Sequence, residues 1–141
     1  MNIKHGHTLS RKKPYEWYYD GENLTIKRKF RIKDEIRNIE DTFSNHQIDM
    51  IMKYIKENEE VYLSNSVADV RDGTAKDGIG KFIYYNLKQD TTFQQSSSQL
   101  VSIFYYADIL SFTKEKNVMK FSIKNSNWRE KLLNFINETK N

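Results

Sequence analysis

The chain has 141 residues, a formal net charge of +4 and a sequence pI near 9.1. This length suits one domain that buries its own core. The sequence contains no cysteine, which excludes disulfides and thiolate metal sites. No apolar run approaches the roughly 20 residues needed to cross a bilayer, so we expect a cytoplasmic protein without a membrane partner.

Positive charge is concentrated toward the two ends of the sequence. Residues 1–33 carry nine Lys or Arg against three Asp or Glu, and residues 94–131 carry six against three. The intervening residues 34–93 carry seven against twelve. A positively charged face attracts phosphate groups because binding releases counterions. The distribution therefore indicates an anionic partner, although lysine-rich surfaces also serve solubility alone.

The first third of the chain is predicted to be an arm followed by a hairpin. Residues 1–14 show no periodicity and contain the only proline and an Arg-Lys-Lys cluster, which predicts a basic flexible arm. Residues 15–141 are expected to form a single α+β domain. Aromatic residues at 15–19 favour a strand, and Asp20-Gly21 favours a tight turn. Residues 24–33 alternate and predict the second strand of the hairpin.

One face of this second strand is basic. Its apolar face holds Leu24, Ile26, Phe30 and Ile32 and is interrupted by Arg28. The opposite face carries Lys27, Lys29, Arg31 and Lys33. Side chains two apart on a strand lie about 6.6 Å from one another, close to the phosphate spacing of a nucleic-acid strand. These four cations are candidate phosphate contacts, although lysines also protect edge strands from aggregation.

The middle of the chain is predicted to be helical. Ile36, Ile39 and Phe43 are spaced three and four apart, which predicts a short helix over residues 34–43. Ser44 and Gln47 form a capping box, which predicts the start of a longer helix. The apolar stripe of that helix consists of Ile48, Ile51, Met52 and Ile55. It is expected to pack on the core.

Two short helices and a connector are predicted next. Residues 61–63 are extended, Ser64 or Asn65 is the expected N-cap of a first helix, and Gly73 ends it. Asp77 is the expected N-cap of a second helix that ends at Leu87. The glycines between them do not match a phosphate-binding loop, because Gly78 is not followed by Lys-Ser or Lys-Thr. Residues 88–95 are predicted to be a polar connector.

The last third of the chain is predicted to be a helix, a hairpin and a closing helix. Serines 96–98 suit an N-cap, and an apolar face follows at Leu100, Ile103, Phe104 and Ala107. Residues 109–113 and 118–123 read as two strands around the polar turn Lys114-Glu115-Lys116-Asn117. The closing helix is predicted from the Asn127 and Glu130 capping pair. Its apolar face holds Trp128, Leu132, Phe135 and Ile136.

A helix that leads into a basic-tipped hairpin is the order in which a winged helix-turn-helix ends. The fold class we expect is therefore α+β, with an N-terminal hairpin, a helical middle, a C-terminal winged-helix-like hairpin and a closing helix. The expected function is non-catalytic binding of nucleic acid, with double-stranded DNA as the partner. Short polar residues would read base edges and the hairpin would contact phosphate. Beyond the four cations of the basic strand, the candidate contacts are Ser97, Ser98, Gln99, Lys114, Lys116 and Lys120.

Other interpretations of the sequence remain open. The predicted helices within residues 64–73 and 77–87 are a rival helix-turn-helix pair. The aromatic residues Trp17, Tyr18 and Tyr19 are candidate anchors for an acidic protein partner, as in an inhibitor or immunity protein. No enzyme, cofactor or metal site is expected, because the three histidines, at 5, 7 and 46, have no orienting partner or third ligand nearby in sequence.

Overall fold

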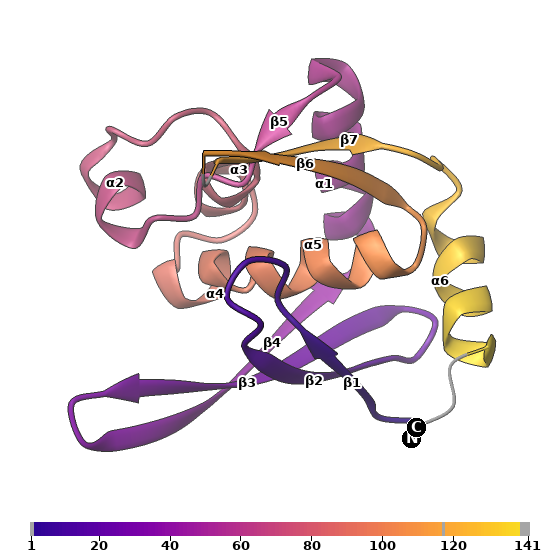
Figure 1. Cartoon of the computed structure of the whole chain (residues 1–141), viewed down its shortest axis with the longest axis horizontal. Helices are drawn as coiled ribbons and strands as arrows, with labels where there is room; N and C mark the ends of the chain where they lie inside the picture. Colours follow the sequence, from indigo (N-terminus) through magenta and orange to yellow (C-terminus); the bar gives the residue numbers. More distant parts are fainter. Residues whose placement is uncertain (1, 117, 139–141) are drawn as a thin grey trace.

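The computed structural model describes residues 2–116 and 118–138 (Figure 1). The strands are β1 (Lys4–His7), β2 (Pro14–Tyr19), β3 (Asn23–Ile32), β4 (Glu35–Ser44), β5 (Val61–Tyr62), β6 (Leu110–Glu115) and β7 (Val118–Ile123). The helices are α1 (Asn45–Asn58), α2 (Val67–Asp72), α3 (Ile79–Asn86), α4 (Thr91–Gln95), α5 (Ser97–Tyr106) and α6 (Trp128–Glu138). The predicted α+β order is confirmed: a sheet first, helices in the middle, then a hairpin and a helix.

Two antiparallel sheets lie on opposite sides of helix α5. The first has the order β1-β2-β3-β4 and the second has the order β5-β7-β6. Figure 1 shows α5, in orange, between the two sheets, and it contacts β1 in one and β6 in the other. Because both sides of this helix face a sheet, apolar residues of all three layers form one core. Its members include Leu24, Phe43, Leu100, Phe104 and Phe121.

The β2–β3 hairpin forms as the sequence predicts. Gly21 has φ +97°, a conformation that glycine adopts without steric cost. The Asp20 carboxylate accepts hydrogen bonds from the backbone N–H groups of Glu22 and Asn23, at 2.8 and 2.7 Å. The side chain thus satisfies two turn donors that no strand partner reaches.

The prediction of a helix over residues 34–43 is wrong, because this segment is strand β4. All ten residues of β4 pair with β3, from Ile32↔Glu35 to Asn23↔Ser44. Residues 33 and 34 form the turn, with Lys33 at φ 55°. Ile39 and Phe43 fit both the spacing of a helix face and the two-residue period of a strand. Asp41, midway between them, faces inward as well, as the strand period requires. A full ladder of strand pairs outweighs the weak helical spacing of three apolar residues.

The outer half of the β3–β4 hairpin extends beyond the rest of the sheet. β2 pairs with β3 only at residues 24–27, so the remaining part is two-stranded. We call residues 28–39 the ribbon. Figure 1 shows it extending away from the body at the lower left. Nearly all of its side chains from Lys29 to Asn38 are exposed.

The sequence predicts a flexible arm over residues 1–14, but the structure has a strand and a closed loop in the described part of this segment. Residues 4–7 form β1, which pairs with β2 from Lys4↔Trp17 to His7↔Pro14. The following loop closes through a hydrogen bond from the Thr8 N–H to the Lys13 carbonyl, at 3.0 Å. Strand pairing therefore places residues 8–13 against the body of the protein.

The helical middle agrees with the sequence for α1 and differs in detail afterwards. Ser44 and Gln47 make both hydrogen bonds of the predicted capping box. Helix α2 is capped by Ser66, and not by either of the two predicted residues, Ser64 and Asn65. Helix α3 begins after Gly78, and Asp77 instead accepts from the Lys81 ammonium at 3.2 Å. The predicted connector over residues 88–95 contains α4, which Asp90 caps.

The C-terminal hairpin and closing helix form where predicted. β6 and β7 pair from Leu110↔Ile123 to Glu115↔Val118, and Asn117 of the predicted turn lies outside the described residues. Trp128 and Leu132 of α6 are buried, as expected. Within the described part of the chain, no helix has the length and apolarity needed to span a membrane.

Candidate functional site

The basic face of β3 is divided by its neighbours in the sheet. Lys27 lies between Glu16 of β2 and Glu40 of β4, which are its cross-strand partners. Opposite charges at paired positions attract, so the two glutamates reduce the positive potential around Lys27. Lys29, Arg31 and Lys33 lie farther out on the ribbon and are exposed. The four predicted cations are therefore not one uniform row.

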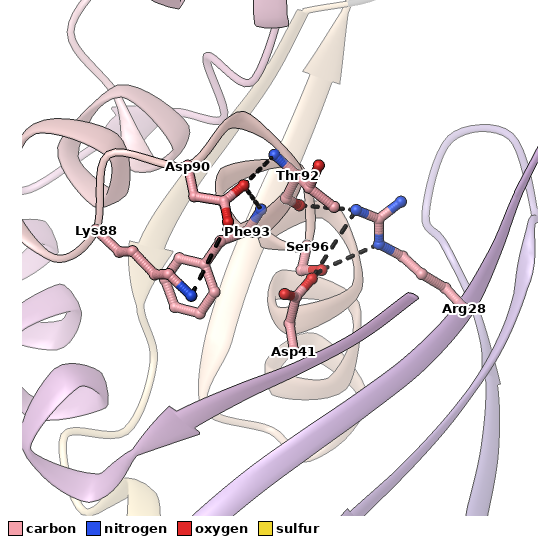
Figure 2. Close-up of polar contacts among 7 residues, drawn as sticks. All are labelled: Arg28, Asp41, Lys88, Asp90, Thr92, Phe93 and Ser96. Carbon is pink, nitrogen blue, oxygen red and sulfur yellow. Dashed lines mark hydrogen bonds and ion pairs between the residues drawn. The ribbon is translucent and has the colours of Figure 1, made fainter. Parts of the chain in front are cut away.

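The Arg28 cluster joins the base of the ribbon to the α4–α5 junction (Figure 2). It consists of Arg28, Asp41, Thr92 and Ser96. The Arg28 guanidinium donates from Nε to Ser96 Oγ at 3.0 Å and from Nη2 to the Thr92 carbonyl at 2.8 Å. Ser96 in turn donates to Asp41 Oδ2 at 2.5 Å. Arg28 Nη2 and Asp41 Oδ2 are 4.0 Å apart, so the serine hydroxyl bridges the two charges more closely than they approach each other.

Helix α4 is positioned for this contact by its own cap. The Asp90 carboxylate accepts from the N–H groups of Thr92 and Phe93, at 2.9 and 3.2 Å. Figure 2 shows Lys88 beside the Phe93 ring. Its ammonium is 5.5 Å from the ring centre. Phe93 packs against Phe43 of β4, with ring centres 4.6 Å apart. The cap and the ring contact therefore hold the Thr92 carbonyl near Arg28.

Burial controls the ionisation of the Arg28 cluster. Burial raises the pKa of Asp41 above its usual range, although the Ser96 hydrogen bond and the Arg28 charge act in the opposite direction. Burial also lowers the pKa of Arg28, an effect that Asp41 partly offsets. Both directions indicate that the loss of hydration outweighs the attraction between the charges. For Asp41, the Ser96 hydrogen bond lowers the pKa more than the Arg28 charge does, so the hydroxyl is the stronger of these two contacts.

The first turn of α5 is too enclosed to enter a DNA groove, contrary to its predicted role as the start of a recognition helix. Ser97 has no exposed surface and Gln99 is 7% exposed. Ser98 is half-buried, and its hydroxyl accepts from Asn65 Nδ2 at 2.5 Å. The reason is that α4 runs directly into α5, so the serines lie inside a helical junction that the ribbon base covers. A recognition helix needs a free N-terminal turn to enter the major groove.

A cleft of about 450 Å³ opens beside this junction. Residues 8–14, the base of the ribbon, the segment before α2 and the first turn of α5 form its walls. Four of the lining residues are cations, and no Asp or Glu is among them. The cations are Arg11, Lys13, Arg28 and Lys29. Such a concave surface with a single sign of charge attracts anions from a distance.

Polar groups supplement these cations in the cleft. Thr8, Ser10, Asn65, Ser66, Gln95, Ser98 and Gln99 all line it. Hydroxyl and amide groups of this kind are common partners of phosphate and sugar oxygens. The Gln99 side-chain oxygen is buried and has no hydrogen-bond partner within the described chain. The structure thus brings together three of the predicted contacts, Lys29, Ser98 and Gln99, around one cavity.

The hairpin cations divide between two faces of the second sheet. Lys114 pairs with Met119, so their side chains share a face, and Met119 lines the cleft. Lys120 lies on the other face, where it is 3.6 Å from Glu60 and 5.3 Å from the Tyr62 ring centre. Lys116 is exposed at the turn, with φ 49°. Lys114 is therefore the hairpin lysine that extends the cationic surface of the cleft.

Two residues of the Arg28 cluster that are not among the predicted contacts still have a signal in the sequence. Arg28 interrupts an apolar face, which is the pattern of a buried cation that needs a partner. Asp41 alternates with Ile39 and Phe43, which places it on the inward face once the segment is a strand. Arg11 and Lys13 belonged to the supposed flexible arm, so their position in a cavity wall had no sequence signal.

Comparison with protein-family models, with curated proteins and with solved structures finds no match to this chain.

Proposed function

We propose that this protein binds nucleic acid without altering it chemically, with DNA as the ligand to test first. The observation that supports this proposal best is the cleft, whose lining holds four cations and no carboxylate. Phosphate contacts dominate nucleic-acid affinity, and they need arginine, lysine and hydroxyl donors rather than a defined reaction centre. The cleft offers these donor types together.

The ribbon extends the same surface. Arg31 of β3 and Lys33 in the turn continue outward from Lys29. Arg37 does not add to this row, because it pairs with Phe30 on the other face of the ribbon and lies 3.7 Å from Glu35. A two-stranded ribbon fits the major groove of B-DNA, which is about 12 Å wide. Contact through the ribbon and cleft replaces the helix-first docking of a winged helix, because the first turn of α5 is covered. Lys120 has no part in this surface.

A salt series measures the proposed contacts directly. Binding of a labelled 20-base-pair duplex is followed by fluorescence anisotropy between about 50 and 200 mM salt, a range over which phosphate-driven binding weakens steeply. The variant Arg11→Ser/Lys29→Ser should bind more weakly at low salt. Its slope of log affinity against log salt should be shallower by about 1.8, the value for two lost phosphate contacts on B-DNA.

A matched variant controls for the change in net charge. Lys53→Ser/Lys56→Ser also removes two exposed cations, but from α1, outside the cleft lining. It should bind nearly as the parent protein does. Equal losses in the two variants would show that only net charge matters. Absence of salt-dependent binding by the parent protein would refute the proposed function.

An acidic protein partner is the second candidate, and the tip region of the ribbon favours it. Ile36 is 54% exposed and Ile32 is 39% exposed, although both are β-branched apolar residues. Apolar side chains at an exposed edge are typical of protein interfaces. In this case an acidic peptide that also carries apolar side chains should displace the labelled duplex, and Ile36→Ser should weaken the peptide complex while leaving duplex binding unchanged.

A further inference from the structure

The shape of the cleft differs from the shape that a duplex requires. Duplex DNA presents a convex surface whose grooves accept protruding protein elements, such as the ribbon. The cleft is concave, so a group that protrudes from the nucleic acid must enter it. Its volume of about 450 Å³ is in the range of sites for small ligands, which starts at about 300 Å³. A single nucleotide that is unpaired is such a group.

The lining of the cleft combines the two chemistries of a nucleotide. Arg11, Lys13 and Lys29 supply positive charge for a phosphate. Phe30 lines the cleft from β3 and is half-buried, and apolar side chains accompany it. The apolar members are Leu9, Leu63, Val67, Val101 and Met119. An unpaired base stacks on aromatic and apolar side chains while its phosphate remains among cations.

Gln99 supplies the polar group that an unpaired base needs. Its side chain is nine-tenths buried in the lining, and its amide oxygen lacks a partner among the described residues. The terminal amide can exchange its oxygen and nitrogen by rotation, so it offers either an acceptor or a donor. The Watson–Crick edge of an unpaired base presents donors and acceptors side by side. In a duplex this edge is occupied by the complementary strand.

We propose that the cleft receives one unpaired nucleotide, with its base against Phe30 and Gln99 and its phosphate beside Arg11 and Lys29. This inference rests on the proposed function and narrows its ligand to nucleic acid with a single-stranded or bulged position. Asn65 positions Ser98 next to Gln99 by donating to its hydroxyl at 2.5 Å. Asn65 itself is fixed by the Gln94 side chain, which donates to its carbonyl at 2.7 Å. The buried Gln94 thus fixes Asn65, which lines the cleft beside Ser98.

The test compares four labelled probes by fluorescence anisotropy at one salt concentration. They are a duplex, the same duplex with one bulged nucleotide, the same bulge with an abasic residue, and a single strand. The parent protein should bind the bulged duplex and the single strand about tenfold more tightly than the perfect duplex, the gain expected from one stacked base. The abasic bulge should return to the affinity of the duplex.

Gln99→Leu keeps the size of the side chain and removes its hydrogen-bonding groups. It should reduce binding of the bulged duplex about tenfold, the value of one lost base contact, while binding of the perfect duplex is unchanged. Gln89→Leu is the control, because Gln89 is exposed and outside the cleft lining. A change in stability alone would affect all four probes equally.

Three results would overturn the inference. Equal affinity for bulged, abasic and perfect duplexes would leave nucleic-acid binding intact but remove the nucleotide pocket. Displacement of the bulged probe by poly-glutamate at the same charge concentration would show a general anion site. Lack of binding to all four probes would reject both the inference and the proposed function.

Discussion

Replacement of Asp41 by asparagine tests whether the charge of Asp41 stabilises the Arg28 cluster. The side chains of Arg28 and Asp41 are 8% and 11% exposed, and their nearest charged atoms are 4.0 Å apart. At this distance the attraction is about 4 kcal/mol for an effective dielectric constant near 20. Dehydration of each ion costs several kcal/mol. The two contributions nearly cancel, and the raised pKa of Asp41 indicates that dehydration is the larger.

Asp41→Asn should therefore change the free energy of unfolding by less than about 1 kcal/mol at pH 7, since asparagine still accepts from Ser96. Ser96→Ala should cost about 2–3 kcal/mol, because it leaves a buried charge without its bridging hydrogen bond. Urea unfolding followed by the fluorescence of the buried Trp17 and Trp128 measures both values. A loss of 3 kcal/mol or more in Asp41→Asn, the value for a broken buried ion pair, would refute the reasoning.

The pH dependence of the free energy of unfolding tests the direction of the Asp41 pKa shift independently. A carboxyl with a raised folded-state pKa binds its proton more tightly in the folded protein than in the unfolded chain. Its contribution to stability is therefore complete below the unfolded pKa and decreases as pH rises through the folded pKa. Asparagine does not titrate. The stability of the parent protein relative to Asp41→Asn should accordingly fall as pH rises through the acidic range, and a rise would contradict the cause assigned here.

Two further predictions concern the core and the first long helix. Tyr15 donates to Ser102 Oγ at 2.7 Å, and burial raises the pKa of Tyr15 to about 12, from 10.0. The stabilisation of about 2–3 kcal/mol is present below pH 10 and is lost as pH rises through 12, because the unfolded chain releases this proton first. Tyr15→Phe should lower the free energy of unfolding by about 1 kcal/mol at neutral pH. Between pH 10 and 12 this variant should lose less stability than the parent protein. If urea unfolding shows the same decline for both proteins, the assignment of the raised pKa to Tyr15 is wrong. Ser44→Ala removes one half of the capping box, whose two hydrogen bonds are 3.0 and 3.1 Å long. It should cost about 1 kcal/mol, measured as a lower urea midpoint with an unchanged slope, whereas an unchanged midpoint would show that the cap contributes nothing.

The parts of the fold that the sequence predicted correctly depend on local signals. The Asp20-Gly21 turn, the Ser44 and Gln47 capping box and the β6–β7 hairpin all lie within a few residues of the groups that define them. The segment over residues 34–43 failed because three apolar residues fit a helix and a strand alike. Its state was decided by pairing with β3, which local spacing does not report.

The candidate site was harder to predict because its walls come from five separate segments of the chain. Lys29, Ser98 and Gln99 were named from local charge and polarity, and they do line one cleft. Burial of Ser97 and Gln99 depends on the α4–α5 junction, and the polar sequence of residues 88–95 predicts a connector where α4 lies. Arg11 and Lys13 line the cleft because β1 pairs with β2, and this pairing places the loop between the two strands beside the cleft. Each failure follows from contacts between residues that are distant in the chain.

The position of α5 between two sheets also has a consequence for biosynthesis. The first sheet is complete once residue 44 has left the ribosome, but the helix that covers its apolar face is encoded at residues 97–106. Until α5 has been synthesised, that cover is missing from Leu24, Ile26 and Phe43. All three are fully buried in the folded protein. Contacts between residues so far apart in sequence slow folding, and the intermediates expose apolar surface that promotes aggregation. Chaperone dependence during translation should therefore be greatest for nascent chains that stop short of α5.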